Sequence, residues 1–443
     1  MPLSAVSLFT NCGAGDIGFA KAGFQFEVLA EIDQGRLAVA SLNLPDSTAI
    51  PGDLRHTWPD VVAAYRDRRD HEPPALLAAC PPCQGLSTAN ARRGIGEDAD
   101  SGSKDMRNLL VVPIAEVALA LMPRVVVVEN VRAFLTRKVR HPHTQEAVSA
   151  AVLLISLLKK EYVAFPFVSD LADYGVPQTR IRSFITFVRR GETCLRLLDE
   201  YGAVPYPTPT HAPDYGGEPV SLRDALHSFE LPALDASSVS AARSDQSLHF
   251  VPVWSSEQYR MVEAIPAGSG ASAWENDDCP KCGSSDLPRD LACCPTCNVR
   301  LQRPHVIEDG QARLVKGFRR SSYRRLSPDR PAATITTGSN RIGSDRTIHP
   351  FENRVLSPLE CQKLQTLPED FKWGDAHKQS RSNLIREMIG EAVPPRFTEA
   401  HGKVLTKLLV NGRPQGLLLR GDQRVSKAAQ KLEALDTVSY PRG

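Results

Sequence analysis

Four consecutive valines, Val125 to Val128, constrain the fold more than any other stretch of this sequence. An uninterrupted apolar run of β-branched residues predicts a strand buried on both faces, which is typical of parallel sheets. Glu129 follows directly at the end of this strand. A carboxylate beside so much apolar surface is costly unless it is paired or protonated, so we interpret Glu129 as a functional residue.

A second apolar run, from Leu76 to Ala79, predicts another buried strand, and it must end at two prolines, which cannot continue a ladder. Cys83 follows those prolines, at the strand end where ligands and reactive groups gather in open α/β sheets. A thiol on a rigid strand end, beneath a glycine-containing loop from Thr88 to Lys104, suits a nucleophile covered by a lid. The alternatives are a buried structural cysteine or a redox or metal pair of Cys80 with Cys83.

The N-terminal segment has the pattern of a nucleotide-binding unit. Residues 5–9 predict a first strand, and the glycine-containing turn 11–18 leads into a helix, where a backbone can approach a nucleotide-like ligand. Glu31 ends a second predicted strand about 20 residues later and is placed to hold ribose hydroxyls. Asp53 ends a third and could accept from an adenine amino group; ordinary surface acids are the alternative for both carboxylates.

Gln178, Arg180 and Arg182 alternate at the start of another predicted strand. Period-two spacing would put all three on one face, where two arginines and an amide suit a polar or anionic ligand. A solvated strand face is the alternative.

The chain changes character after Arg190, where several prolines between residues 205 and 219 mark a domain boundary. Two C-x-x-C knuckles then predict a structural zinc ribbon with four ligands, against the alternative of coincidental spacing: Cys279, Cys282, Cys294 and Cys297. Cys293 falls outside the knuckle spacing. The arginine-rich stretch from Arg313 to Arg346, which includes Arg324 and Arg325, is interpreted as a phosphate-binding strip rather than a merely solvated face.

Composition sets the broad class of the protein. The chain has 443 residues, which is too long for one simple core. Its apolar content of 42% is ordinary for a globular protein. No apolar run could span a membrane, and no basic-then-apolar signal opens the chain, so we expect a cytoplasmic protein without a membrane partner. Ten clustered cysteines favour thiol chemistry and metal in a reducing compartment over a disulfide scaffold.

Taken in order, these stretches resemble the cytosine-5 DNA methyltransferase family over nearly the whole chain. The resemblance rests on the glycine turn and on five further segments, at residues 81–84, 129–131, 178–182, 330–336 and 390–395. It implies an α/β fold, a Rossmann-like class I methyltransferase sheet with helices on both faces, plus a smaller, irregular target-recognition domain that carries the zinc ribbon. We expect the catalytic domain at 1–200 and 346–410, the recognition domain at 201–345 with the ribbon at about 275–302, and a polar, partly disordered tail at 411–443.

The chain departs from the family pattern at two positions. Asn11 stands where the family has the first glycine of its first motif, and Glu391 stands where the last motif usually has asparagine. Asparagine tolerates a left-handed backbone better than most residues, so we expect the turn to be kept.

The resemblance implies methyl transfer from S-adenosylmethionine to C5 of a cytosine flipped out of duplex DNA. Cys83 would attack C6, Glu129, with a raised pKa, would protonate or hydrogen-bond N3, and Arg182 would hold O2, supported by Arg180 and Gln178. The cofactor would be lined by seven residues of the strand ends: Phe9, Asn11, Gly13, Glu31, Asp53, Leu54 and Pro82.

Double-stranded DNA and structural Zn²⁺ complete the expected ligands. We expect a monomer, with a restriction or phage-defence protein as a possible partner. Two other functions stay open at this point: an RNA (tRNA) cytosine-5 methyltransferase, and a non-catalytic DNA-binding module on a decayed methyltransferase core.

Overall fold

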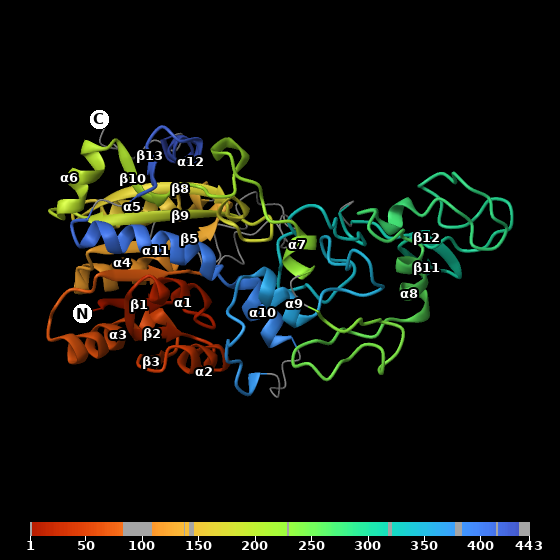
Figure 1. Cartoon of the computed structure of the whole chain (residues 1–443), viewed down its shortest axis with the longest axis horizontal. Coiled ribbons are helices and arrows are strands. Elements are labelled where there is room, and N and C mark those ends of the chain that lie inside the picture. The colour runs from red at the N-terminus through yellow and green to blue at the C-terminus, as the bar shows by residue number, and fades with distance from the viewer. Residues whose placement is uncertain are drawn as a thin grey trace.

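A seven-stranded sheet forms the centre of the larger part of the molecule (Figure 1). The computed structural model describes residues 2–82, 109–136, 138–140, 146–227, 230–317, 321–376, 383–412 and 415–433. From one edge of the sheet to the other, the strands are β3 (Thr48–Pro51), β2 (Phe24–Glu31), β1 (Leu3–Leu8), β4 (Leu76–Ala79), β5 (Val125–Val131), β9 (Ile181–Arg189) and β8 (Tyr162–Asp170).

The first five strands of this order run parallel, and β9 is antiparallel to both of its neighbours. This confirms the predicted Rossmann-like sheet and places the carboxyl ends of β1, β2, β4 and β5 at one edge, where open α/β sheets bind their ligands.

The four valines of β5 divide between two cores, as their sequence predicted. Val126 and Val128 join the core under α3 (Leu54–Arg69), α4 (Val111–Leu121) and α5 (Ala150–Leu158). Val125 and Val127 join the opposite core, to which three further helices contribute: α1 (Ala14–Lys21), α6 (Thr193–Glu200) and α11 (Pro395–Leu409). Helices therefore cover both faces of the sheet (Figure 1).

Helix α11 comes from the far end of the chain and crosses α1 at very short range. A Cβ built on Gly18 of α1 would lie 2.3 Å from the carbonyl oxygen of Pro395. The Thr398 hydroxyl also donates to the carbonyl of Gly15 at 2.7 Å. The N-terminal nucleotide-binding unit thus depends on residues that the chain supplies almost 400 positions later.

The smaller part of the molecule extends to the right in Figure 1 and has little regular structure. It contains α7 (Leu222–His227), α8 (Ser256–Glu263) and the hairpin of β11 (His305–Glu308) with β12 (Gln311–Leu314). Two helices, α9 (Pro358–Leu364) and α10 (Leu384–Glu391), lie between it and the sheet (Figure 1). A small separate sheet pairs β6 (Lys138–Arg140) with β7 (Ala147–Ser149), just before α5.

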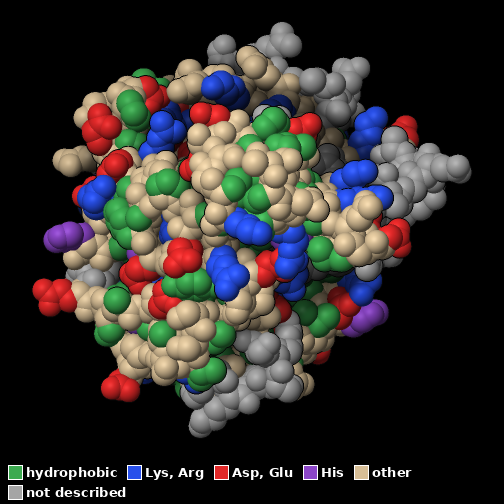
Figure 2. Space-filling model, turned by 90° about the vertical axis from the view of Figure 1, so that its right-hand side faces the viewer, with side chains coloured by type: hydrophobic (Ala, Val, Ile, Leu, Met, Phe, Trp, Pro, Cys, Tyr) green, Lys and Arg blue, Asp and Glu red, His purple; other side chains and the backbone are tan. Residues whose placement is uncertain are grey.

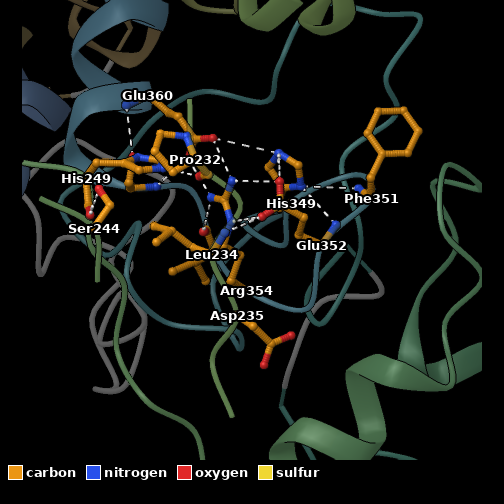
Figure 3. A network of polar contacts seen from close by, with 12 residues as sticks. Pro232, Leu234, Asp235, Ser244, His249, His349, Phe351, Glu352, Arg354 and Glu360 are labelled. Atoms are coloured by element: carbon orange, nitrogen blue, oxygen red, sulfur yellow. Dashed lines mark hydrogen bonds and ion pairs between the residues drawn. The ribbon is translucent and has the colours of Figure 1, made fainter. Parts of the chain in front are cut away.

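A buried polar network joins the smaller part to α9 (Figure 3). Arg354 donates to both carboxylate oxygens of Glu360, at 2.7 and 2.9 Å, and to Glu352 at 2.8 Å. Although burial alone would raise the pKa of Glu360, the hydrogen bonds and charge of Arg354 lower it to about 2. Beside this pair, burial lowers the pKa of His349 to about 4. The Arg354–Glu360 ion pair is therefore charged and buried. It fixes the orientation of the chain where it passes from the smaller part into α9.

The C-terminal segment differs from the expected polar, partly disordered tail. Residues 415–433 form β13 (Leu417–Leu419), which pairs with β10 (Ala203–Pro207), and α12 (Gln423–Glu433), which packs against β8. Ala428 and Leu432 of α12 belong to one core of the sheet and Val425 to the other, so the helix covers the outer edge strand.

No helix among the described residues is long and apolar enough to cross a membrane.

Candidate active site

A large cavity of about 1400 Å³ opens at the carboxyl ends of the parallel strands. Its wall includes residues that follow β1, β2, β4 and β5, together with the start of β9 and the segment after α10. The predicted site residues that line it are Phe9, Asn11, Glu31, Asp53, Leu54, Pro82, Glu129, Arg180 and Arg182.

The turn after β1 keeps the left-handed shape that was predicted for Asn11. The φ angles are +57° at Phe9, +53° at Asn11 and +78° at Gly13, so two residues other than glycine adopt this conformation. Met388 of α10 accepts a hydrogen bond from the Asn11 side-chain amide at 3.0 Å, which ties the turn to the last motif of the chain. Gly13 precedes α1 and is absent from the cavity wall, so it shapes the turn rather than facing a ligand.

Glu31 lies at the end of β2, and its carboxylate is held by the backbone. One oxygen accepts from the amide of Asn11 at 2.9 Å and the other from the amide of Asp33 at 3.1 Å. Burial raises the pKa of Glu31, and these amides act in the opposite direction. Beside it, the side-chain carbonyl oxygen of Asn11 is buried without a hydrogen-bond partner among the described residues. Two acceptor groups on the cavity wall fit the hydroxyl and amino donors of a nucleoside cofactor.

Asp53 lies at the rim of the cavity and is already engaged. It accepts from the backbone of Arg55 at 3.0 Å as the N-cap of α3, and it forms an ion pair with the Arg55 side chain. Hydrogen bonding to Arg55 lowers the pKa of Asp53. Leu54 follows it, buried, and gives this rim an apolar surface next to a carboxylate.

Glu129 is buried at the end of β5 and has a partner on each oxygen. The Cys80 thiol donates to Oε2 at 2.8 Å, and Nε of Arg182 lies 3.1 Å from Oε1. The neighbouring Asn130 donates to the carbonyl of Pro81 at 2.9 Å and so fixes the chain immediately before Cys83. The ends of β4, β5 and β9 thus meet around one carboxyl group. Cys83 itself, and the loop from Thr88 to Lys104, lie outside the described residues.

Only Arg182 belongs to β9, which begins at Ile181, so strand alternation does not extend to Gln178 and Arg180. Arg180 and Arg182 both line the cavity, whereas Gln178 does not. Gln178 is fully buried and donates to the carbonyl of Leu364 at 2.9 Å and to Gln365 at 2.6 Å. Arg180 is 1% exposed, and its guanidinium donates to three carbonyls, those of Ile335, Gly390 and Ala392, at 3.1, 3.1 and 2.8 Å. Both side chains hold segments of chain together, Arg180 at the cavity wall and Gln178 outside it.

Three contacts of the site could not be predicted from local patterns in the sequence. Glu391, noted as a departure from the family pattern, forms an ion pair with Arg36 of α2 (Gln34–Asn43). Asp16 is buried in α1 and accepts from the hydroxyls of Ser7 and Thr10, the first at 2.9 Å. Cys80 contacts Glu129 as described above. Each pair joins residues whose proximity depends on the tertiary fold.

The predicted metal ligands form a cluster in the smaller part of the molecule. Sγ atoms of Cys279, Cys282, Cys294 and Cys297 all lie within 4.8 Å of one another. The Cys279–Cys297 and Cys282–Cys294 sulfur distances are both 3.6 Å, close to the ~3.8 Å edge of a tetrahedron with zinc–sulfur bonds of about 2.3 Å. Cys293 is outside the cluster, as predicted. The donor set therefore fits a closed structural zinc site.

The predicted phosphate-binding strip is wrong for Arg325 and does not hold for Arg324. Arg325 is 2% exposed and donates to backbone carbonyls, among them those of His349 at 3.0 Å and Ile265 at 3.0 Å. Arg324 pairs with Glu275 at 2.6 Å. The clustering of arginines in the sequence does not show which way each side chain points. At the end of the smaller part of the molecule, Figure 2 shows lysine and arginine side chains interspersed with acidic ones.

Comparison with known proteins gives a consistent assignment. A family model described as C-5 cytosine-specific DNA methylase matches residues 3–407. The chain is 26% identical to the type II methyltransferase M1.HgaI of Avibacterium volantium over 90% of this chain and 96% of the relative. It is 30% identical to the type II methyltransferase M.AquIA of a Picosynechococcus species over 50% of this chain and 82% of the relative.

Among solved structures, a putative DNA modification methyltransferase encoded within an Escherichia coli prophage has the same fold. The TM-score is 0.56 at 22% identity, over 92% of this chain and 99% of the other.

Proposed function

Given that the chain belongs to the C-5 cytosine-specific DNA methylase family, we propose that it methylates C5 of a cytosine flipped out of duplex DNA, by way of a covalent bond between Cys83 and C6. The observation that carries this proposal is the position of Glu129. It lies in the cavity at the strand ends, where Cys80 and Arg182 contact its carboxyl group. The next residue, Asn130, donates to the carbonyl of Pro81 in the segment that leads into Cys83.

Each polar group has a task that follows from the chemistry of the ring. C5 of cytosine is a poor nucleophile, and attack by the Cys83 thiolate on C6 makes C5 enamine-like. Negative charge then develops at N3 and O2, where Glu129 as a proton or hydrogen-bond donor and Arg182 as a cation would stabilise it. After methylation a water molecule takes the C5 proton, the C5–C6 double bond forms again, and the C6–sulfur bond breaks to release the Cys83 thiolate. A base inside a duplex cannot reach this site, so it must be flipped out.

S-adenosylmethionine supplies the methyl group in this family. Glu31 would accept from the ribose hydroxyls, and the side-chain oxygen of Asn11, which has no hydrogen-bond partner in the described part of the chain, would be a second acceptor. Phe9, Leu54 and Pro82 supply apolar wall, and Asp53 at the rim would accept from the adenine amino group.

Gln178 and Arg180 support the site indirectly. They bind the carbonyls of Leu364, Gly390 and Ala392, and so hold the segments after α9 and α10 against the start of β9. Arg182, two residues on, is thereby presented to Glu129 from a fixed backbone.

We assign residues 201–345 to target recognition, with zinc bound by the four-cysteine cluster, and residues 1–200 and 346–410 to catalysis. Zinc held by four thiolates has no open position, so it would stabilise the fold of the recognition domain and take no part in methyl transfer. The names of the relatives further suggest a type II restriction–modification role, in which methylation protects a host sequence in the cytoplasm from a partner nuclease.

The experiment is to sequence 5-methylcytosine in the DNA of a methylation-free host that expresses the chain. We expect one sequence motif to be methylated by the wild type and to be lost in Cys83→Ser. It should be largely kept in Cys80→Ser, the matched control two prolines upstream, because a serine hydroxyl can also donate to Glu129. Methylation that survives in Cys83→Ser would refute the assigned nucleophile. An unmethylated genome together with methylated tRNA would refute DNA as the substrate.

A further inference from the structure

The C-terminal segment after the family match is folded against the active-site cavity. The family model ends at residue 407, whereas β13 and α12 follow at 417–433. Pairing of β13 with β10 fixes the segment at one end (Figure 1). Arg424 fixes the start of α12, because it is buried and donates to Asp173 at 2.7 Å and to Asp214 at 2.9 Å. The helix is therefore a rigid part of the catalytic domain.

The orientation of α12 follows from its buried residues. Val425, Ala428 and Leu432 pack into the two cores of the sheet. Lys427 and Lys431 are four residues apart, one helical turn, and so lie next to each other on a different side of the helix. Lys427 is exposed and Lys431 is half-buried.

Lys431 of this pair lies at the cavity, next to the segment that follows β5. Helix α12 packs against the short 3₁₀ helix η2 (Arg132–Leu135), which directly follows Glu129, Asn130 and Val131. Lys431 and Arg132 both line the cavity that contains Glu129 and Arg182, and Arg132 is exposed.

Among the residues that the structure describes, none of the cations Lys427, Lys431 and Arg132 forms an ion pair with a carboxylate. Lys427 donates to the neutral Gln423 at 2.7 Å. Burial lowers the pKa of Lys431, and the nearby positive charges of Arg132 and Lys427 add to this effect. A half-buried cation such as Lys431 beside two further positive charges is unfavourable in the free protein, which suits a site completed by an anionic ligand.

We propose that Lys427, Lys431 and Arg132 bind the phosphate backbone of the duplex DNA that carries the target cytosine. This inference rests on the proposed function, since it concerns the same cavity and the same substrate. Lysine side chains bind phosphates as point charges without reading base edges, so the C-terminal helix anchors DNA of any sequence beside the site, while specificity stays with the recognition domain.

The test is the salt dependence of DNA binding by full-length Lys427→Gln/Lys431→Gln, with a duplex containing the methylated motif and a duplex without it. Glutamine keeps the length and the helix propensity of lysine while removing the charge. Loss of two phosphate contacts should reduce the slope of log K against log salt by about 1.8 and weaken binding about 30-fold at 0.15 M salt, for both duplexes alike. Arg132→Gln should act in the same direction.

The matched control is Lys21→Gln, which removes an exposed lysine from α1 that is outside the cavity wall. Unchanged thermal unfolding of the double variant would show that α12 remains folded. If the wild type binds no duplex, the proposed function fails together with this inference. If the wild type binds DNA but the double variant keeps its slope, or if Lys21→Gln lowers the slope equally, the phosphate site alone is refuted.

Discussion

Replacing Arg180 by methionine should destabilise the whole domain arrangement rather than a single surface. Methionine has a similar unbranched length but no donors, so the carbonyls of Ile335, Gly390 and Ala392 would each lose a charged partner. Hydrogen bonds to charged groups contribute about 1.5–3 kcal/mol each, and relief from burying a guanidinium offsets part of the loss. We expect the free energy of unfolding to fall by about 3–5 kcal/mol, at the upper end for single substitutions.

Because the chain is long, this loss of unfolding free energy lowers the melting temperature only modestly. At about 2.1 cal/mol/K per residue, unfolding 443 residues has an entropy of about 0.9 kcal/mol/K, so the midpoint should fall by about 3–5 °C. A local readout is therefore more sensitive. Hydrogen–deuterium exchange should increase in peptides that contain Ile335 and in those that contain Gly390, because the guanidinium is their shared contact.

Arg190→Met is the matched control for this prediction. Arg190 lies just past β9 and is exposed, and among the described residues its side chain donates only to the carbonyl of Lys159, at 3.2 and 3.1 Å. Its loss should change the free energy of unfolding by no more than about 0.5 kcal/mol. If Arg180→Met unfolds like Arg190→Met and leaves exchange at both segments unchanged, the reasoning about this buried guanidinium is refuted.

Three further predictions concern the site, the metal and pH. Glu129→Gln should reduce turnover about 10²-fold or more while keeping S-adenosylmethionine binding, and a loss below about 10-fold in single-turnover kinetics would contradict its role as proton donor. Cys282→Ser should remove zinc from the purified protein, measured by elemental analysis, and lower the melting temperature, whereas Cys293→Ser should retain zinc; equal metal content in both variants would exclude the ribbon. Burial raises the pKa of Asp16 to about 6, so its carboxylate stays protonated in the folded state at pH values where the unfolded chain has lost that proton. When the pH is lowered from 7.5 to 4.5, the unfolding free energy of the wild type should therefore rise by about 2 kcal/mol relative to that of Asp16→Asn. If denaturant titrations show the same difference between the two proteins at both pH values, the prediction is wrong.

The features that the sequence predicted correctly are those with local physical causes. The valines of β5 pack on both faces because an apolar, β-branched run has no polar side to expose. Asn11 adopts a left-handed backbone because its side chain tolerates that conformation. The four cysteines cluster because two knuckles of this spacing bring their sulfurs together whatever the surrounding chain does.

The features that the sequence did not predict depend on contacts between distant segments. Alternation does not apply to Gln178 and Arg180 because β9 starts only at Ile181, and that start is set by pairing with β5 and β8. Arg325 is indistinguishable from its neighbours in sequence, yet carbonyls of other segments surround it. The ordered C-terminal helix depends on pairing of β13 with β10, some 200 residues earlier in the chain.

The crossing of α1 by α11 has a consequence for how the protein is made. During synthesis the sheet from β1 to β9 emerges with part of one face bare, because the helix that covers it, α11, comes only after the smaller part of the molecule in the chain. More than 200 residues must leave the ribosome before Phe397 and its neighbours can close that face. At about 5–20 residues per second, the exposed apolar surface persists for about 10–40 seconds. A chain truncated before residue 395 would keep this apolar surface exposed, so we expect it to aggregate and not merely to be inactive.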